Sequence, residues 1–344
     1  MAPAEMPRDR GGEGAPQILC AGIIVLDEVF RVEDFPKADG KVEAEGFFVV
    51  NGGCAANAAV AVVRLGGRAV LAGPLGGPAG VDDNGDRVLA ALERERVDTS
   101  ACQRVAGLAT ALSAIFIDAR GDRTIVTYRD QRIANVRPVN VDALVAGADL
   151  VLADNRYPEF ARPICEAARR RNLRVVVDGD KPTVATDPLF RLASHVVFSA
   201  ECLIATTGCS DLPAGLKLVA CHTDAFLAVS NGRNDILFLE NGSLRSVPVF
   251  NIRAVDTLGA GDALHGGFAL ALAEGRSEAQ ALRFGAAVAG LKCTRLGGSA
   301  GTPTRSEVEA FLAEQAADRS GPGGVATTVL APESGSVENA IDLE

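Results

Sequence analysis

The stretch VDTLGAGDALHGGF, residues 255–268, places glycines and aspartates where a helix begins. Leu264, Phe268 and Leu272 recur at helical spacing, and Gly275 is typical of a helix end. Free amides at a helix N-terminus favour anions, and glycines let an anion approach the backbone. A carboxylate beside such a site makes sense if it accepts a proton from a group that is being phosphorylated. The alternative interpretation is an acidic residue that caps the helix.

A second glycine-rich stretch, NGGCAANAAVAVVRLGG at residues 51–67, also opens a predicted helix. Gly52 and Gly53 permit close approach of a ligand to the backbone, and Asn57 offers both a hydrogen-bond donor and an acceptor. The same small residues are equally suited to tight packing of the helix on a sheet.

The run ILCAGIIVLD, residues 18–27, reads as a buried parallel strand that ends in Asp27. Ligands of open α/β sheets bind at the carboxyl ends of the strands, where a carboxylate can accept hydrogen bonds from sugar hydroxyls. A solvated strand end is the alternative for Asp27.

The amino-acid composition limits the classes of molecule that this protein is expected to bind. The chain has 344 residues and a net charge of −10, without a cluster of basic residues, which disfavours nucleic acid and favours small molecules. Apolar runs are short, and residues 1–17 lack the apolar core of a signal peptide, so we expect no membrane partner and a cytoplasmic location. Eight cysteines without a Cys-x-x-Cys pair and three scattered histidines indicate reduced thiols and no zinc site.

Predicted strands and helices alternate through one domain, residues 17–318, between two disordered tails, residues 1–16 and 319–344. This alternation predicts an α/β fold whose mostly parallel central sheet carries helices on both faces. A dehydrogenase is disfavoured because no Gly-x-Gly-x-x-Gly turn follows the first strand.

Two segments interrupt the alternation. Residues 29–50 look extended, and residues 112–130 read as a hairpin around the turn ARGDR. We expect both to form a small antiparallel β lid over the carboxyl ends of the main strands, where it would exclude water. An edge extension or a homodimer contact through the lid is the compatible alternative.

Together, NGGCAANAAVAVVRLG and VDTLGAGDALHGGF, in this order and about 200 residues apart, resemble the motifs of the PfkB (ribokinase-like) carbohydrate kinases. The resemblance extends over about residues 17–315 and implies a ribokinase-like fold. It implies that Gly259, Ala260 and Gly261 form an anion hole and that Asp262 deprotonates the acceptor hydroxyl.

The resemblance also implies that Asp27, Gly52, Gly53 and Asn57 hold the sugar hydroxyls. ATP would be the phosphoryl donor with Mg²⁺ as its companion, although the motifs name no protein ligand for the metal. Whether a monovalent cation supports the anion hole is left open.

On the nucleotide side, the resemblance implies contacts from Ser230, Gly232, Thr257 and Gly297. This sequence departs from the family pattern at two places near these residues. Asn234 and Asp235 stand where the family has small residues.

The second departure concerns an Asn-x-x-Glu motif that helps to place magnesium and phosphate in the family. Ser199 and Cys202 occupy its positions here. Glu201, one position early, either substitutes for the missing glutamate through water or faces solvent.

Within the family, LVLADNRYPEF, VVVDGD, HVVFSAE and LKCTRLGGSAGTP resemble the sulfofructose kinase branch. This resemblance implies that Lys41 and Arg156 hold the sulfonate of 6-deoxy-6-sulfofructose, whose 1-hydroxyl is phosphorylated. Thr127 stands where the branch carries an amide side chain, which loosens the expected specificity. Read without the resemblance, each basic residue is a solvated surface charge.

The leading hypothesis is therefore an ATP-dependent sugar kinase. Its rivals are a general ketose or ribose kinase, in which Arg156 is structural, and a weakly catalytic sugar- or nucleotide-binding regulator of the same fold. The intact GAGD with Asp262 argues against the regulator, and the missing Asn-x-x-Glu motif favours it.

Overall fold

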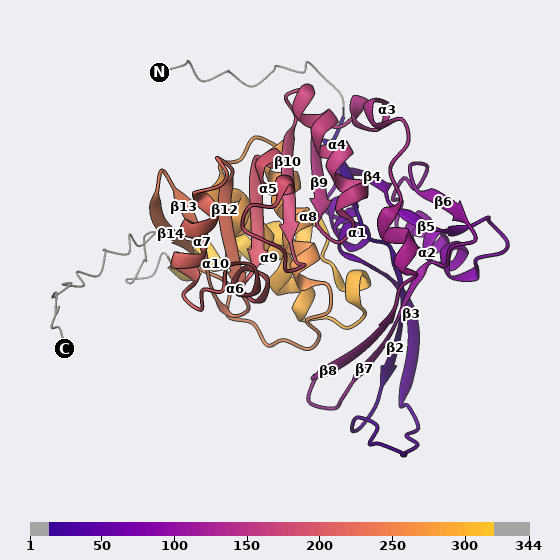
Figure 1. Ribbon diagram of the computed structural model, residues 1–344. Coiled ribbons are helices and arrows are strands. Elements are labelled where there is room, and N and C mark those ends of the chain that lie inside the picture. Colours follow the sequence, from indigo (N-terminus) through magenta and orange to yellow (C-terminus); the bar gives the residue numbers. More distant parts are fainter. Residues whose placement is uncertain (1–13, 320–344) are drawn as a thin grey trace, which may run out of the picture.

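The computed structural model describes residues 14–319. Its centre is an eight-stranded sheet between two layers of helices (Figure 1). The strands from β12 to β4 are parallel, and β13 and β14 join antiparallel at one edge. In spatial order they are β14 (Ser243–Val247), β13 (Asn234–Glu240), β12 (Phe226–Asn231), β11 (His195–Ser199), β10 (Arg174–Gly179), β9 (Leu150–Asp154), β1 (Gln17–Ala21) and β4 (Arg68–Ala72).

Helices cover both faces of this sheet, as the strand–helix alternation predicts. Along β1, Ile18 and Cys20 enter one apolar core while Leu19 and Ala21 enter the other, because successive side chains of a strand point to opposite faces. The first core is covered by α1 (Cys54–Arg64), α2 (Asp83–Arg94), α8 (Ala260–Ala273), α9 (Glu278–Cys293) and α10 (Arg305–Arg319). The second is covered by α3 (Val141–Ala146), α4 (Pro158–Arg170), α5 (Pro188–Leu192), α6 (Ala200–Thr207) and α7 (Leu212–Ala220).

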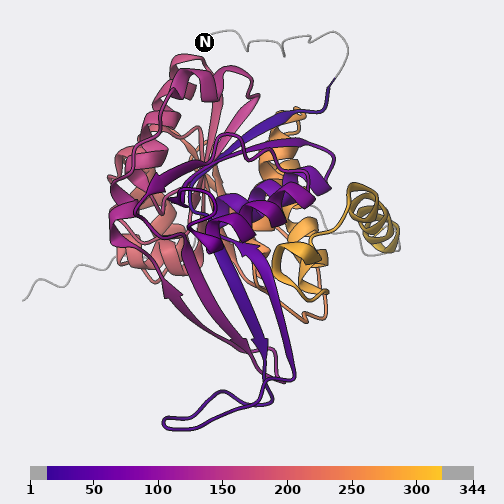
Figure 2. The same ribbon diagram turned by 90° about the vertical axis from the view of Figure 1, so that its right-hand side faces the viewer.

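A four-stranded second sheet projects from the body in both views (Figure 1, Figure 2). In spatial order it contains β3 (Gly46–Gly52), β2 (Val25–Arg31), β7 (Ala111–Ile117) and β8 (Arg123–Tyr128). We call it the lid. The predicted hairpin at 112–130 is confirmed, but the lid is mixed rather than purely antiparallel, because β2 and β7 run parallel.

The prediction of one strand over residues 18–27 is wrong, because the chain leaves the main sheet after β1 and enters the lid as β2. Gly22 lies at the break with φ +154°, and a Cβ there would come within 2.0 Å of an Asp154 carboxylate oxygen. A glycine is therefore required where the two sheets meet. Asp27 consequently belongs to the lid and does not end a core strand.

Smaller elements complete the described part of the chain. They are a two-stranded sheet of β5 (Pro74–Gly77) and β6 (Gln103–Ala106), and the short 3₁₀ helices η1 (Gln131–Asn135) and η2 (Gly298–Gly301). All eight cysteines are free thiols in this structure. Among residues 14–319, no helix is long and apolar enough to cross a membrane. The predicted tails lie almost entirely outside the described residues.

Candidate active site

The N-terminus of α8 offers free amides next to a carboxylate. Gly259 is the N-cap residue at φ +74°, a left-handed conformation that favours glycine. The first hydrogen bond within the helix runs from the Ala263 N–H to the Gly259 carbonyl at 3.0 Å. The Gly261 N–H lies before this bond and is therefore free of an intrahelical partner. The Ala260 N–H donates to the Thr257 carbonyl at 3.2 Å instead. An ideal Cβ on Gly261 would meet no atom within 4 Å, so this side of the turn is open.

Asp262, in the first turn of α8, is oriented by a chain of polar side chains. Its Oδ2 accepts a hydrogen bond from Asn57 Nδ2 at 2.7 Å. Asn57 Oδ1 accepts from Asn51 Nδ2 at 3.0 Å, and Asn51 Oδ1 accepts from Ser299 Oγ at 3.1 Å. Two segments far apart in the sequence, residues 51–57 and the loop with Ser299, therefore fix one carboxylate.

The environment of Asp262 suits a general base. Burial raises its pKa to about 7, the Asn57 hydrogen bond opposes this rise, and the negative charges of Asp180 and Asp154 add to it. A base is most effective when its pKa lies near the working pH, because it is then largely ionised and still accepts a proton readily.

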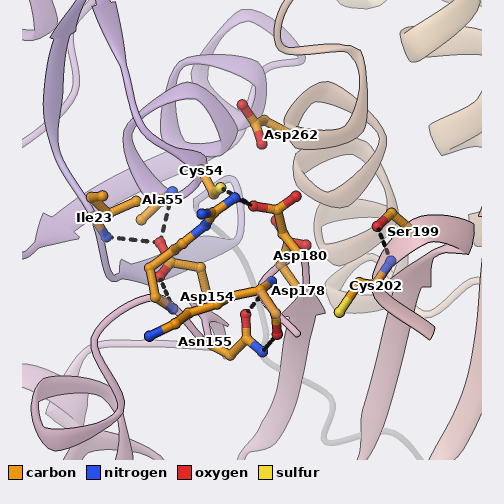
Figure 3. A network of polar contacts seen from close by, with 12 residues as sticks. Ile23, Cys54, Ala55, Asp154, Asn155, Asp178, Asp180, Ser199, Cys202 and Asp262 are labelled. Atoms are coloured by element: carbon orange, nitrogen blue, oxygen red, sulfur yellow. Dashed lines mark hydrogen bonds and ion pairs between the residues drawn. The ribbon is translucent and has the colours of Figure 1, made fainter. Parts of the chain in front are cut away.

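A second carboxylate, Asp154 at the end of β9, connects the elements around the site (Figure 3). Its Oδ2 accepts from the N–H groups of Ile23 at 2.8 Å and Ala55 at 3.2 Å, and its Oδ1 accepts from the Arg156 N–H at 2.9 Å. Burial raises its pKa to about 6, and these backbone hydrogen bonds oppose the rise. Asp154 therefore joins β1, α1 and β9 at the point where the lid begins.

Two more carboxylates follow from β10. Asp178 forms a cluster with Cys54 and Asp262. One carboxylate oxygen of each aspartate and the Cys54 Sγ all lie within 4.8 Å of one another. Burial, together with Asp180 and Asp262, raises the pKa of Asp178 well above its usual value. Cys54 Sγ donates to Asp180 Oδ2 at 3.5 Å, and the Arg156 guanidinium pairs with the same Asp180 oxygen (Figure 3).

The base of the lid carries a polar patch formed by neighbouring strands. Asp27 lies against Gly52, where a Cβ would come within 2.0 Å of Asp27 Oδ2. Across the sheet, Asp27 is paired with Ser113, whose Oγ lies 3.2 Å from Thr127 Oγ1. Burial raises the pKa of Asp27 to about 6, and the Ser113 hydrogen bond opposes the rise.

Gly53 and Asn57 connect this patch to α8. Gly53 is the N-cap residue of α1 at φ +94°, and a Cβ there would lie 2.4 Å from the Ile23 carbonyl oxygen. The close approach of two backbones therefore accounts for this glycine. The structure brings Gly53, Asn57 and Asp262 together, since Asn57 contacts Asp262 directly.

Sequence reasoning missed two buried polar atoms at this site, Arg129 Nε and Tyr157 Oη. Neither has a hydrogen-bond partner among the described residues, which is unusual for buried donors. Burial raises the pKa of Tyr157 to about 12, while the positive charges of Arg129 and Arg156 oppose the rise. Arg129 also acts on Asp27, whose pKa it lowers. Arg129 is therefore close enough to act on the charges of both Asp27 and Tyr157.

The residues expected to contact nucleotide fall into two groups. Ser230 and Gly232 lie at the end of β12, where the Ser230 hydroxyl donates to the Phe198 carbonyl at 3.3 Å. Thr257 accepts a hydrogen bond from the guanidinium of Arg123, a lid residue that sequence reasoning missed.

Gly297 belongs with Thr257. Its N–H donates to Asp256 Oδ2 at 3.0 Å, which brings the loop before η2 against the loop before α8. Two segments about 40 residues apart are thus joined beside the turn that leads into α8.

The structure does not bring Lys41 and Arg156 together. Lys41 is exposed in the connection between β2 and β3, which lies at the end of the lid remote from the main sheet (Figure 1, Figure 2). Arg156 lies at the site, but its charge is already balanced by Asp180. The expectation that Lys41 and Arg156 together hold a sulfonate is therefore wrong within a single chain.

At the position of the missing Asn-x-x-Glu motif, Ser199 caps α6 and accepts a hydrogen bond from the Cys202 N–H at 3.2 Å. Glu201 is exposed. Burial and, to a smaller extent, Asp180 raise the pKa of Cys202 to about 11. The charges of Asp180 and Asp178 both act on this position.

One sequence signal could have found these acids. DLVLAD and RVVVDGD are predicted parallel strands that both end in aspartate. The carboxyl ends of such strands bind ligands, so the argument given for Asp27 applies to these aspartates as well. Asn51 and Ser299 carried no such signal, because their role depends on contacts between distant segments.

Together, a parallel α/β sheet, a β lid, and a half-buried carboxylate at a glycine-rich helix N-terminus define an enzyme that transfers a phosphoryl group to a small-molecule hydroxyl. The chain belongs to the pfkB family of carbohydrate kinases, whose family model matches residues 15–305. It is a carbohydrate kinase of the ribokinase and fructokinase type.

Relatives agree with this assignment. An ATP-dependent ribose-1-phosphate kinase from Halopiger xanaduensis is 31% identical over 311 residues, covering 87% of this chain and 99% of the relative. The crystal structure of a candidate ribokinase from Agrobacterium tumefaciens is similar with a TM-score of 0.84 and 38% identity, covering 88% and 99% of the two chains. A fructokinase from Xylella fastidiosa with bound ATP gives a TM-score of 0.70 and 25% identity, covering 87% and 99%.

Proposed function

We propose that this protein transfers the γ-phosphoryl group of ATP to a hydroxyl of a ribose- or ketose-type sugar, with Asp262 as the general base. The observation that carries the proposal is the position of Asp262: a half-buried carboxylate, whose pKa desolvation raises to about 7, next to the free amide of Gly261. The ATP bound to the fructokinase relative supports the choice of donor.

In the proposed reaction, the sugar hydroxyl gives its proton to Asp262 while its oxygen forms a bond to the γ-phosphorus. The bond from that phosphorus to the β–γ bridging oxygen breaks, and ADP leaves. The N–H groups of Gly259 and Gly261 hold the charge that develops on the transferred phosphoryl oxygens. Asn57 keeps the Asp262 carboxylate aimed at the acceptor through its 2.7 Å hydrogen bond.

The sugar would lie between the base of the lid and α1. Asp27 accepts hydrogen bonds from hydroxyl groups, and Asn57 and Thr127 supply donors. Gly52 and Gly53 let the Asp27 carboxylate and the Ile23 backbone lie close against this segment, which shapes the pocket beside α1. The lid excludes water, which would otherwise compete with the sugar for the γ-phosphoryl group.

The nucleotide would lie along the ends of β11 and β12, with Ser230, Gly232, Thr257 and Gly297 beside it. Asp178 belongs to the cluster with Cys54 and Asp262, and Asp180 follows it two positions later. Their carboxylate oxygens are the ligands that magnesium prefers, so Asp178 and Asp180 would hold it. Bound magnesium would neutralise charge on the phosphates. Cys54 does not suit this metal, because thiols are soft ligands.

A second candidate substrate class is a sugar that carries a fixed negative charge, with 6-deoxy-6-sulfofructose and phosphorylation of its 1-hydroxyl as the first example. The observation that favours it is the pair of buried, unpartnered groups, Arg129 Nε and Tyr157 Oη, beside Arg156. A tetrahedral oxyanion would satisfy both. A relative named for a sugar phosphate, ribose-1-phosphate, supports an anionic substrate.

We further propose that the protein forms a homodimer through the outer face of the lid. Phe30 packs against Phe47 and Phe116 with ring centroids 4.9 and 5.5 Å apart. Phe47, Val126 and Tyr128 remain 55%, 62% and 59% exposed beside this cluster. An apolar surface of this kind is typical of a contact between protein chains.

The direct test is an ATP-consumption screen over ribose, fructose, nucleosides, ribose 1-phosphate and 6-deoxy-6-sulfofructose, with product phosphorylation confirmed by mass spectrometry. We expect kcat/KM to be highest for a ribose- or ketose-type sugar. Comparison of charged and neutral members decides between the two substrate classes. A protein that binds these sugars but phosphorylates none of them would be the weakly catalytic regulator.

A further inference from the structure

Lys292, near the C-terminus of α9, has its side chain completely buried. Among residues 14–319 it is the one lysine in the buried class, and its side chain is 0% exposed. Its Nζ donates to the Asp256 carbonyl oxygen at 2.9 Å and lies 3.1 Å from Asp256 Oδ2. Burial lowers the pKa of Lys292, and the Asp256 carboxylate opposes this and favours the charged ammonium.

The Asp256 carboxylate accepts hydrogen bonds from the backbone of two loops, both next to the proposed anion hole. Its Oδ1 accepts from the Leu258 N–H at 2.8 Å, in the loop that leads into α8. Its Oδ2 accepts from the N–H groups of Gly297 and Gly298 at 3.0 and 3.1 Å, in the loop before η2. Lys292 therefore fixes the position of Asp256, whose carboxylate in turn fixes the backbone of both loops.

Both loops lead directly to the catalytic groups. The first continues through Gly259 into the turn that carries Asp262. The second continues to Ser299, whose hydroxyl begins the polar chain through Asn51 and Asn57 to Asp262. Movement of Asp256 would therefore displace the Asp262 carboxylate and the amides beside it.

The position next to Asp256 also requires a positive charge. Asp256 is only 5% exposed, and its carboxylate lies near the place where phosphate charge must bind. A buried carboxylate without a cationic partner is unfavourable, and two nearby negative charges repel each other. A free monovalent cation could meet this requirement in principle. The Asp256 carboxylate and carbonyl oxygens that would bind it already accept from Lys292, so these residues do not fit a separate ion.

We propose that the Lys292 ammonium is a covalently tethered monovalent cation that positions Asp256 and the anion hole, so that phosphoryl transfer by this protein needs no added potassium or ammonium ion. Lys292 is a positioning residue, because it acts through Asp256 and touches neither substrate. The kinetic part of the inference rests on the proposed function.

The first experiment uses the wild-type protein, dialysed into tetramethylammonium buffer, and measures kcat with KCl, NH₄Cl or tetramethylammonium chloride at equal ionic strength. We expect kcat to change by less than about twofold between the salts. An increase of about tenfold or more with KCl or NH₄Cl would overturn the proposal, whatever the variants do.

The second experiment removes the ammonium. In tetramethylammonium buffer, Lys292→Ala should lower kcat by about 10² or more, the scale of a small misplacement of the catalytic groups, with little change in the KM for sugar. NH₄Cl should raise the kcat of Lys292→Ala at least about tenfold, because a free cation then has room beside Asp256. Lys292→Met fills the space and should lose kcat without rescue. Lys217→Met, at an exposed position on α7, is the matched control and should behave as wild type.

A thermal-unfolding measurement without sugar or ATP separates this inference from the proposed function. NH₄Cl should raise the Tm of Lys292→Ala relative to tetramethylammonium chloride, and should leave the wild-type Tm unchanged. A folded Lys292→Ala that keeps wild-type kcat, or that shows neither kinetic rescue nor a Tm increase with NH₄Cl, would overturn the role of Lys292. Absence of activity toward every sugar, with the Tm response intact, would instead overturn the proposed substrate class.

Discussion

Asn57 and Asp262, which are 205 positions apart in the chain, are joined by a 2.7 Å hydrogen bond from Nδ2 to Oδ2. This contact connects the first turns of α1 and α8, one next to the proposed sugar site and the other at the anion hole. It holds the proposed base in place and moderates its affinity for protons. Most of the following predictions depend on this geometry.

Replacement of Asp262 by asparagine should lower kcat by about 10² or more, the usual effect of losing a positioned base. The asparagine can still accept the Asn57 hydrogen bond, so the affinity for sugar should change little. Steady-state kinetics and sugar titration by calorimetry measure the two quantities. Near wild-type turnover would mean that Asp262 only caps α8.

The same variant should be more stable than the wild type at alkaline pH. The pKa of Asp262 is raised by burial, so its favourable contribution to folding is present at acidic pH and is lost as the pH rises through about 7. Asp262→Asn removes this titration. The loss extends from about pH 4, the ordinary pKa of an aspartate, to about pH 7, so the Tm advantage of the variant should be larger at pH 8 than at pH 5.

The pH dependence of kcat/KM should follow the ionisation of Asp262. Activity requires the carboxylate, so kcat/KM should rise with pH and level off above about 7. In Asn57→Ala the hydrogen bond that lowers this pKa is lost, and the rise should move to higher pH. A profile that stays at the wild-type position in Asn57→Ala would contradict this electrostatic role.

The lid should become ordered when sugar binds. Asp27, Gly52 and Thr127 lie at its base, so a bound sugar would connect its strands to α1. Amide hydrogen exchange should therefore slow in residues 29–50 and 112–130 on addition of sugar, while β10 and β11 serve as internal controls. Unchanged exchange in both segments would remove the lid interpretation.

Arg129 and Arg156 should distinguish charged from neutral sugars. A hydrogen bond to a charged group is strong enough that Arg129→Gln and Arg156→Ala should each lower kcat/KM for 6-deoxy-6-sulfofructose by about 10- to 150-fold. The effect on fructose should be several-fold at most. Arg129→Gln is the cleaner test, because Arg156→Ala also leaves Asp180 without its partner.

Arg132→Gln is the matched control for these two variants. Arg132 lies close to Arg129 in the chain, but it is exposed and paired with Asp130. It should leave both sugars unaffected. Equal losses for fructose and the sulfonated sugar in Arg129→Gln would favour a general ketose or ribose kinase.

The proposed dimer should dissociate when charge is placed on the outer face of the lid. Phe47 is 55% exposed there and packs on Phe30, so Phe47→Lys should halve the mass in sedimentation. Val184→Lys, at an exposed position on the body, is the control and should keep the dimer. A wild-type protein that is monomeric at all concentrations would exclude this assembly.

Local patterns in the sequence were sufficient for much of the fold. Alternating apolar runs and amphipathic segments predicted the parallel sheet, its two helical layers and the hairpin at 112–130, because these depend on side-chain spacing within a segment. The position of Asp262 in the first turn of a helix after Gly259 was equally local. The paired motifs were enough to indicate a carbohydrate kinase.

Only the tertiary structure decided which distant groups meet. The strand break at Gly22 depends on Asp154, and the charge of Arg156 is balanced by Asp180, so neither could be read from its own segment. The position of Lys41, far out on the lid, likewise follows from how β2 and β3 project from the body. Periodicity states which face of an element is buried, whereas partners, charge balance and the pKa of Asp262 arise from contacts between segments that the chain order leaves undetermined.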